Sequence, residues 1–347
     1  MRKSKMRKRW GPPSDWLKIE TLEVHAAGEP LRIITAGLSP IPGKTMLEKR
    51  RYAQEHLDDL RTTLMWEPRG HADMYGCILT EAVSEDGDLG VLFLHNEGFS
   101  TMCGHGIIGL ATAIFQTGFV GIAEGRPCLK IDTPAGRVTA RVRMEKGQAR
   151  EVSFLNVPSY VVALNQAVNV PGIGRLSVDL AFGGAFYAFC RAEDLGVQLV
   201  SGEFRRLIDV GMKVKRAVGE SLPVRHPLEE ELGFLYGTII VGPPENPAHH
   251  SRNVCVFAEG EVDRSPTGTG VSARAAIHYA KGELKIGEPF TVESILGTAF
   301  SGRVDEVTQL GPYSAVIPEV TGSAHITGKC EFLIDPADPL RRGFILR

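Results

Sequence analysis

Short apolar runs alternate with turn-forming residues along most of the chain. The runs cover residues 31–34, 90–94, 129–131, 137–142, 237–241, 254–258 and 290–292. Runs of this length between Gly, Pro, Asn and Asp residues are typical of strands, and the short connections favour hairpins over crossovers. Residues 46–64 and 203–217 instead carry charges at helical spacing, which predicts two surface helices.

Two further segments share a pattern and predict two helices of equal length. The sequence TMCGHG at 101–106 is matched by SPTGTG at 265–270, and an apolar or Ala-rich stretch follows each. Gly118 lies 15 residues after Cys103, and Gly282 lies 15 residues after Thr267. Glycine commonly follows the last residue of a helix, so each motif is expected to open a helix of about four turns. The first helix has almost no polar face, which predicts burial on nearly all sides.

The matched helices indicate an internal duplication. The tripeptide Gly-Arg-Val occurs at 136–138 and again at 302–304, downstream of each motif. Each half of the chain is therefore expected to wrap strands around one central helix. A length of 347 residues leads to the same expectation of two domains, at roughly 150 residues per domain.

Composition and charge exclude several classes of protein. Hydrophobic residues make up 43%, charged residues 23%, and the formal net charge is -2, so no nucleic-acid partner is expected. No apolar run reaches about 18 residues, so no transmembrane helix is expected. Gly-Pro-Pro follows the basic first ten residues, which predicts a disordered tail over 1–16 rather than a secretory signal. Six scattered cysteines without a Cys-x-x-Cys pair favour a reduced, cytoplasmic protein.

The start of each matched helix is a candidate binding site. Free backbone N–H groups and the positive end of the helix dipole lie there, and glycine lets a ligand approach the backbone. Two such starts facing one another across a cleft would bind a small carboxylate. The same position stabilises a thiolate, so the pKa of Cys103 is expected to fall from about 8.5 towards neutrality. Cys103 is therefore a candidate general base.

Together the motifs resemble the paired signatures of the proline racemase superfamily. The resemblance rests on MCGHG at 102–106 and DRSPTGTG at 263–270, with HAAGEPLR at 25–32, PRGH at 68–71, NEG at 96–98 and GG at 183–184 in the expected order. It implies a diaminopimelate-epimerase-like α+β fold: two similar domains, each a curled, mainly antiparallel sheet around a central helix, with the active site in the cleft between them. The first domain would span 17–165 plus 336–347, and the second 166–335.

One departure from the family pattern bears on the reaction. Members that racemise proline or epimerise 4-hydroxyproline have a cysteine in each motif, whereas this chain has Thr267 in the second. A neutral hydroxyl has no proton-transfer pKa near 7, so a two-base mechanism is not expected. The resemblance then implies a hydro-lyase that degrades trans-3-hydroxy-L-proline to 1-pyrroline-2-carboxylate and water. The alternative is a proline racemase or hydroxyproline 2-epimerase.

The resemblance also implies roles for individual residues. Catalysis would fall to Cys103 and Thr267, and substrate binding to the amides of Gly104, His105, Gly268 and Thr269 around the carboxylate and to Asp263, with the His105 side chain, at the ring nitrogen. No cofactor and no metal is expected, because backbone N–H groups can hold the developing charge. Whether Thr267 or His105 assists departure of the hydroxide stays open. A homodimer is expected from the family alone.

Structural interpretations stand beside these roles. Core packing or capping could account for Cys103 and His105, turn initiation for Asp263, and helix capping for Thr267 and Thr269. A noncatalytic carboxylate-binding protein is therefore the third hypothesis. Two neighbouring histidines at 249–250 do not complete a metal site, and GHGIIG at 104–109 lacks the βαβ context of a dinucleotide fingerprint.

Overall fold

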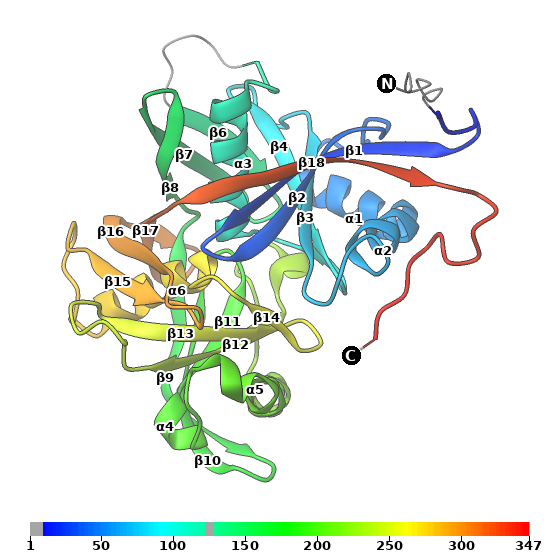
Figure 1. Ribbon diagram of the computed structural model, residues 1–347. Coiled ribbons are helices and arrows are strands. Elements are labelled where there is room, and N and C mark those ends of the chain that lie inside the picture. Colours follow the sequence, from blue (N-terminus) through cyan, green and yellow to red (C-terminus); the bar gives the residue numbers. More distant parts are fainter. Residues whose placement is uncertain (1–9, 122–127, 347) are drawn as a thin grey trace, which may run out of the picture.

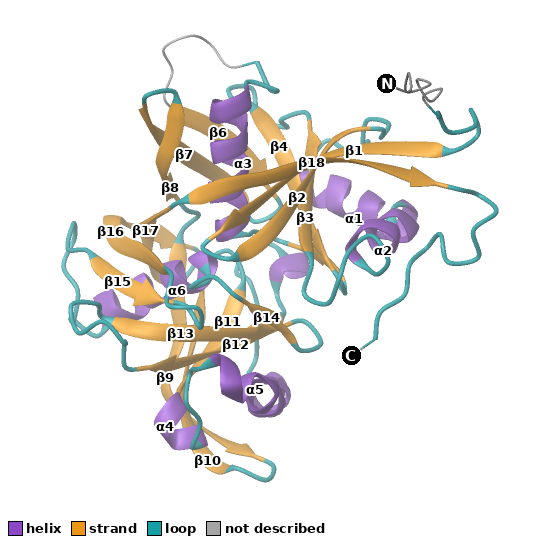
Figure 2. Ribbon diagram, viewed as in Figure 1, coloured by secondary structure: helices purple, strands orange, loops and turns teal. Residues whose placement is uncertain are grey.

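The computed structural model describes residues 10–121 and 128–346, so most of the predicted basic tail lies outside the described residues. Strands dominate the fold and helices occupy a smaller share of it (Figure 2). Most strand pairs are antiparallel, but four are parallel, so the architecture is a mixed, sheet-rich α+β one. Among the described residues, no helix is both long enough and apolar enough to cross a membrane.

The described residues of the first part of the chain form eight strands and three helices. In chain order these are β1 (Leu17–Ala26), β2 (Glu29–Ala36), α1 (Met46–His56), α2 (Asp58–Met65), β3 (Tyr75–Thr80), β4 (Leu89–His95), β5 (Gly98–Ser100), α3 (Gly104–Thr117), β6 (Cys128–Thr133), β7 (Gly136–Glu145) and β8 (Gln148–Leu155).

The remaining part continues with β9 (Ser159–Val170), β10 (Gly174–Phe182), β11 (Phe186–Arg191), α4 (Ala192–Leu195), the 3-10 turn η1 (Ser201–Glu203), α5 (Phe204–Ser221), the 3-10 turn η2 (Glu230–Leu232), β12 (Leu235–Gly242), β13 (Ser251–Phe257), β14 (Glu261–Asp263), α6 (Gly268–Ala280), β15 (Phe290–Glu293), β16 (Ala299–Leu310), β17 (Tyr313–Gly322) and β18 (Ala324–Ile334).

The strand pairings repeat between the two halves of the chain. β4 pairs antiparallel with β3 and β5 and parallel with β6. In the same way, β13 pairs antiparallel with β12 and β14 and parallel with β15. Helix α3 lies in the chain between β5 and β6, and α6 lies between β14 and β15. The two matched motifs therefore occupy equivalent places in a repeated topology.

Each matched helix is enclosed by the strands of its own half (Figure 1). Helix α3 packs against β1, β2, β7, β8 and β18, and α6 packs against β9, β10, β16 and β17. Every residue from Gly104 to Ile114 is buried, as is every residue from Gly268 to Ile277. The predicted burial of the first helix is confirmed. Because the rest of α3 is apolar and buried, its N-terminus, where the backbone N–H groups are free, is the part of the helix that can bind a ligand.

The last strand of the chain returns to the first half. β18 pairs antiparallel with β1 along most of its length, and Figure 1 shows the two side by side. β9 pairs with β10 and with β17, which places it among the strands of the second half. The predicted domain limit at 165 thus lies within β9, and the predicted second domain includes β18.

The predicted helix over 46–64 is two helices. The helical conformation is interrupted at Leu57, which lies between the end of α1 and the start of α2. Asp58 and Asp59 lie in the first turn of α2, where the helix dipole favours negative charge, and so they support a new helix start. The second predicted helix, over 203–217, is α5 and extends to Ser221.

Candidate active site

The two matched helices meet at their first residues. A Cβ atom added to Gly104 would lie 2.6 Å from the Cα of Gly268, and one added to Gly268 would lie 2.8 Å from the Cα of Gly104. Any side chain at either position would therefore collide with backbone. The absence of side chains here lets two helix N-termini with free N–H groups face the same space.

A cavity of about 20 Å³ lies at this junction. All seven residues that the sequence predicts as site residues line it: Cys103, Gly104, His105, Asp263, Thr267, Gly268 and Thr269. Six residues that sequence reasoning missed complete the lining: Tyr75, Met102, Tyr187, Tyr236, Cys255 and Phe257.

Cys103 is the residue immediately before α3, and its sulfur is held by the helix start. The N–H of Gly106 donates to Sγ at 3.2 Å, and Nδ1 of His105 lies 3.2 Å from the same atom. Burial raises the pKa of the thiol well above its usual value, although the Gly106 N–H acts to lower it. The negative charges of Asp263 and Glu29 raise it further.

The expected fall in the pKa of Cys103 is therefore wrong in direction. The helix start stabilises a thiolate as expected, but loss of water around the sulfur outweighs this effect. A positive charge brought into the cavity would favour the thiolate, because it would offset the two neighbouring carboxylates.

Thr267 has an unusual backbone for a β-branched residue. Its φ is 65° and its ψ is 90°, in a region that costs such residues energy. The side chain makes no capping hydrogen bond to α6, so the capping interpretation is wrong for this residue. Within the described residues its buried Oγ1 has no hydrogen-bond partner of good geometry, although it is near enough to lower the pKa of Asp263 and Cys255. The hydroxyl is thus available to a ligand in the cavity.

Burial shifts the pKa values of Asp263 and His105 in opposite directions. Burial raises the pKa of Asp263 to about 6, although hydrogen bonds from Ser265, one of them a 2.7 Å bond from its N–H, oppose this change. Burial lowers the pKa of His105 to about 3, against the effect of the Pro30 carbonyl, which accepts a hydrogen bond from it. At neutral pH the pair is a carboxylate and a neutral imidazole, which suits the binding of a cation.

Three tyrosines form a hydroxyl-bearing wall of the cavity. The hydroxyl of Tyr75 lies 2.6 Å from Oγ of Ser100 and 3.3 Å from the hydroxyl of Tyr236. The hydroxyl of Tyr187 lies 2.7 Å from Oγ1 of Thr269. Burial raises the pKa of all three phenols, so they remain protonated and can donate hydrogen bonds. They come from β3, β11 and β12, whose apolar sequences carry no local sign of this role.

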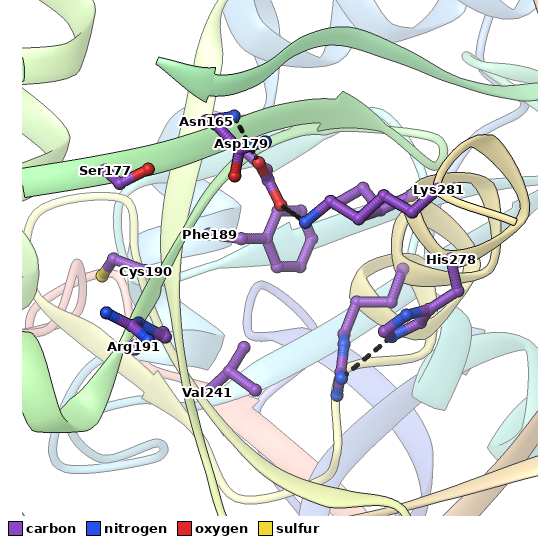
Figure 3. Close-up of a pocket in the computed structure, with 11 residues that line it drawn as sticks. Asn165, Ser177, Asp179, Phe189, Cys190, Arg191, Val241, His278 and Lys281 are labelled. Atoms are coloured by element: carbon purple, nitrogen blue, oxygen red, sulfur yellow. Dashed lines mark hydrogen bonds and ion pairs between the residues drawn. The ribbon is translucent and has the colours of Figure 1, made fainter. Parts of the chain in front are cut away.

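A larger cavity lies elsewhere and is separate from the helix starts (Figure 3). It measures about 400 Å³ and is lined by β9 to β12 and by the C-terminal half of α6. There Lys281 pairs with Asp179 at 2.6 Å, and Arg274 donates to Nε2 of His278 at 3.1 Å. Its charged side chains are thus already paired within the fold.

The two adjacent histidines do not come together on one ligand. Nδ1 of His249 lies 2.9 Å from Oε1 of Glu293, whereas Nδ1 of His250 lies 3.0 Å from Oγ of Ser251. Within the described ranges, no group of three or more His, Cys, Asp and Glu residues is arranged to hold a metal ion.

The fold and the site define a protein of two matched halves whose central helices share one small polar cavity at their N-termini. A sequence model described as Proline racemase matches residues 21–345. The chain belongs to the proline racemase family.

Its relatives include proteins with different reactions. A protein of Colwellia psychrerythraea named trans-3-hydroxy-L-proline dehydratase is 46% identical, over 97% of this chain and 96% of the relative. A Burkholderia multivorans protein named 3-hydroxyproline 2-epimerase is 45% identical, over 95% of this chain and 98% of the relative. The crystal structure of a hydroxyproline epimerase from Agrobacterium vitis with bound trans-4-hydroxy-L-proline superposes with a TM-score of 0.89, at 30% identity, over 95% and 96% of the two chains.

Proposed function

We propose that this protein dehydrates trans-3-hydroxy-L-proline to 1-pyrroline-2-carboxylate and water. Overall identity does not distinguish a dehydratase from an epimerase, because relatives with either name are almost equally similar. The observation that carries the proposal is Thr267, a residue with no acid or base function near neutral pH. It lines the same cavity as Cys103 and holds the matched position before the other helix.

The cavity offers complementary groups for each part of such a substrate. The free N–H groups at the starts of α3 and α6 would bind the carboxylate, since both helix dipoles favour negative charge there. Asp263 and the neutral imidazole of His105 would bind the ring ammonium. The ammonium would in turn offset the carboxylates that raise the pKa of Cys103, so substrate binding itself favours the thiolate.

Cys103 would then remove the Cα proton. The developing negative charge spreads onto the carboxylate, where the backbone N–H groups stabilise it without a cofactor. Thr267 cannot return a proton from the opposite side, so the carbanion expels the 3-hydroxyl instead. The resulting enamine tautomerises to the cyclic imine.

The test is to follow purified protein and trans-3-hydroxy-L-proline in deuterium oxide by proton NMR. The proposal expects 1-pyrroline-2-carboxylate to form with loss of the hydroxyl-bearing carbon signal. Formation of the Cα epimer, with the hydroxyl retained and no imine formed, would make the protein an epimerase and refute the proposal. A Cys103→Ser variant should lose turnover. If the variant retains turnover, the thiolate mechanism is wrong. If the wild-type protein has no turnover, the noncatalytic hypothesis is favoured.

We also propose a division into two domains that differs from the sequence prediction. Strand pairing supports a first domain of β1 to β8 with β18, and a second domain of β9 to β17, joined by the pairing of β8 with β17. The small cavity would then lie between the domains, with one helix start from each. The cytoplasmic location and the homodimer stay predictions.

A further inference from the structure

The stereochemistry of the proposed substrate determines on which face of the ring the group that protonates the leaving hydroxide must lie. In trans-3-hydroxy-L-proline the 3-hydroxyl and the carboxylate are on opposite faces of the ring. The Cα hydrogen is also opposite the carboxylate, so it shares a face with the 3-hydroxyl. Removal of both groups is therefore a syn elimination. The group that protonates the hydroxide must therefore lie on the side of Cys103, whereas Thr267 belongs to the start of the other helix.

Three of the polar lining residues belong to the half of the chain that carries Cys103. Cys103 and His105 belong to the start of α3, and Tyr75 belongs to β3 of the same half. The polar lining residues Asp263, Thr267 and Thr269 come from the second half. Tyr187 and Tyr236 also come from the second half, and the hydroxyl of Tyr236 lies 3.3 Å from that of Tyr75. His105 is neutral and its Nδ1 lies beside the sulfur of Cys103 at 3.2 Å, where it suits the ring ammonium rather than the 3-hydroxyl.

Tyr75 has the position and the contacts of a proton donor. Its ring lies edge-on to that of His105, with centroids 4.8 Å apart, and its hydroxyl is close enough to lower the pKa of the Cys103 thiol. Ser100 lies 2.6 Å from this hydroxyl, and Ser100 itself is buried behind the cavity wall. This fixed contact orients the phenol, so it need not reorganise during the reaction.

We propose that Tyr75 is the general acid for departure of the 3-hydroxyl, oriented by Ser100. This inference rests on the proposed dehydratase function and names the group that its mechanism lacks.

The proton transfers balance within the cavity. The Cys103 thiolate takes the Cα proton, and the electron pair of that bond forms the carbon–carbon double bond as the C3–O bond breaks. Tyr75 gives its proton to the departing hydroxide, which leaves as water. The Cys103 thiol then protonates the Tyr75 phenolate. Both residues return to their starting states, and no other reactant is consumed.

The closing experiment separates proton removal from loss of hydroxide in a Tyr75→Phe variant. This change keeps the ring contacts and removes only the hydroxyl, so the fold should be retained. Dehydration of trans-3-hydroxy-L-proline is expected to fall at least about 100-fold, as for loss of a general acid. Cα hydrogen–deuterium exchange is expected to change less than about tenfold, because the Cys103 step remains.

A second substrate tests the same point through its leaving group. Fluoride needs no full proton to depart, so elimination from trans-3-fluoro-L-proline should be nearly as fast in Tyr75→Phe as in the wild type. The matched control is Tyr187→Phe, which removes a hydroxyl from the same cavity on the side of Thr269. It should slow both substrates by the same factor.

The outcomes distinguish the two proposals. Undiminished dehydration by Tyr75→Phe would overturn the role of Tyr75 and leave Cys103 as its own proton shuttle. Equal losses of exchange, dehydration and defluorination would show a merely structural role and overturn it too. A wild type that exchanges the Cα hydrogen without dehydration would instead overturn the proposed function, and the role of Tyr75 with it.

Discussion

Thr267 combines features that a purely structural residue rarely has together. Its left-handed backbone costs energy, its side chain is buried, and its hydroxyl has no partner of good geometry among the described residues. Strain of this kind is maintained where it places a group at a functional site. Its position, matched to that of Cys103 in the same cavity, makes it the residue at which the choice between elimination and epimerisation can be tested.

Replacing Thr267 with cysteine should add a second proton carrier. Cysteine lacks the β-branch that clashes in the left-handed region, so the variant should fold at least as well. We expect Thr267→Cys to gain measurable epimerisation at Cα, with cis-3-hydroxy-D-proline detected by chiral chromatography. Thr267→Ser, which keeps a hydroxyl, should gain none. A cysteine variant without any epimer would contradict the assigned place of this residue.

Asp263 should control the acidic limb of the pH profile. Burial raises its pKa to about 6, so the carboxylate proposed to bind the ammonium is present above this pH and lost below it. The value of kcat/KM should therefore fall as the pH decreases through about 6. Asp263→Asn should lower kcat/KM at pH 7 by about tenfold or more and remove this limb. A limb that persists in the variant would assign the titration to another group.

At the scale of elements, regular patterns were predictable and short or irregular ones were not. The glycines at 118 and 282 mark the ends of the matched helices to within two residues. Gly118 has a left-handed backbone directly after α3, and Gly282 has one two residues after the end of α6. The break at Leu57 was missed because charge spacing continues through it, although Asp58 and Asp59 are a signal for a helix start. The tyrosines of the cavity wall were missed because tertiary folding alone brings strands β3, β11 and β12 to the helix starts.

The contact between the two helix starts is itself testable. Gly104→Ala would place a methyl group 2.6 Å from the Cα of Gly268, which the backbone can relieve only by moving the helices apart. We expect a loss of about 1–3 kcal/mol in the free energy of unfolding, measured by denaturant titration, and a loss of most activity. Gly219→Ala on α5 is the matched control, since nothing lies within 4 Å of its added Cβ. It should be neutral or slightly stabilising.

Across the whole molecule, buried polar contacts tie the two halves together around β14. Nδ1 of His95 lies 2.6 Å from Oε1 of Glu261 at one end of this strand. Just beyond the other end, Oε2 of Glu29 accepts a hydrogen bond of 2.7 Å from the N–H of Arg264. Glu29 belongs to the HAAGEPLR motif, whose presence was visible in the sequence but whose partner was not, because 235 residues separate them. Asp263 is thus held between two fixed points.

Removing one of these contacts should lower the free energy of unfolding far more than removing a surface ion pair. Glu261→Ala leaves His95 buried without this partner, and we expect the free energy of unfolding to fall by about 3 kcal/mol. Asp209→Ala breaks the exposed pair with Lys213 and should cost less than about 1 kcal/mol. Urea titration of both variants compares them directly. Equal costs would show that the contact between β4 and β14 does not hold the halves together.

The small volume of the cavity has a consequence for kinetics. A space of about 20 Å³ holds about one water molecule and is far too small for a ring amino acid. A ligand can therefore enter only if the helix starts move apart, and the observed association rate should then equal the intrinsic rate multiplied by the fraction of time spent apart. Release requires the same separation, so an inhibitor that contacts both helix starts should stabilise the closed state and have a longer residence time than one that contacts a single helix start.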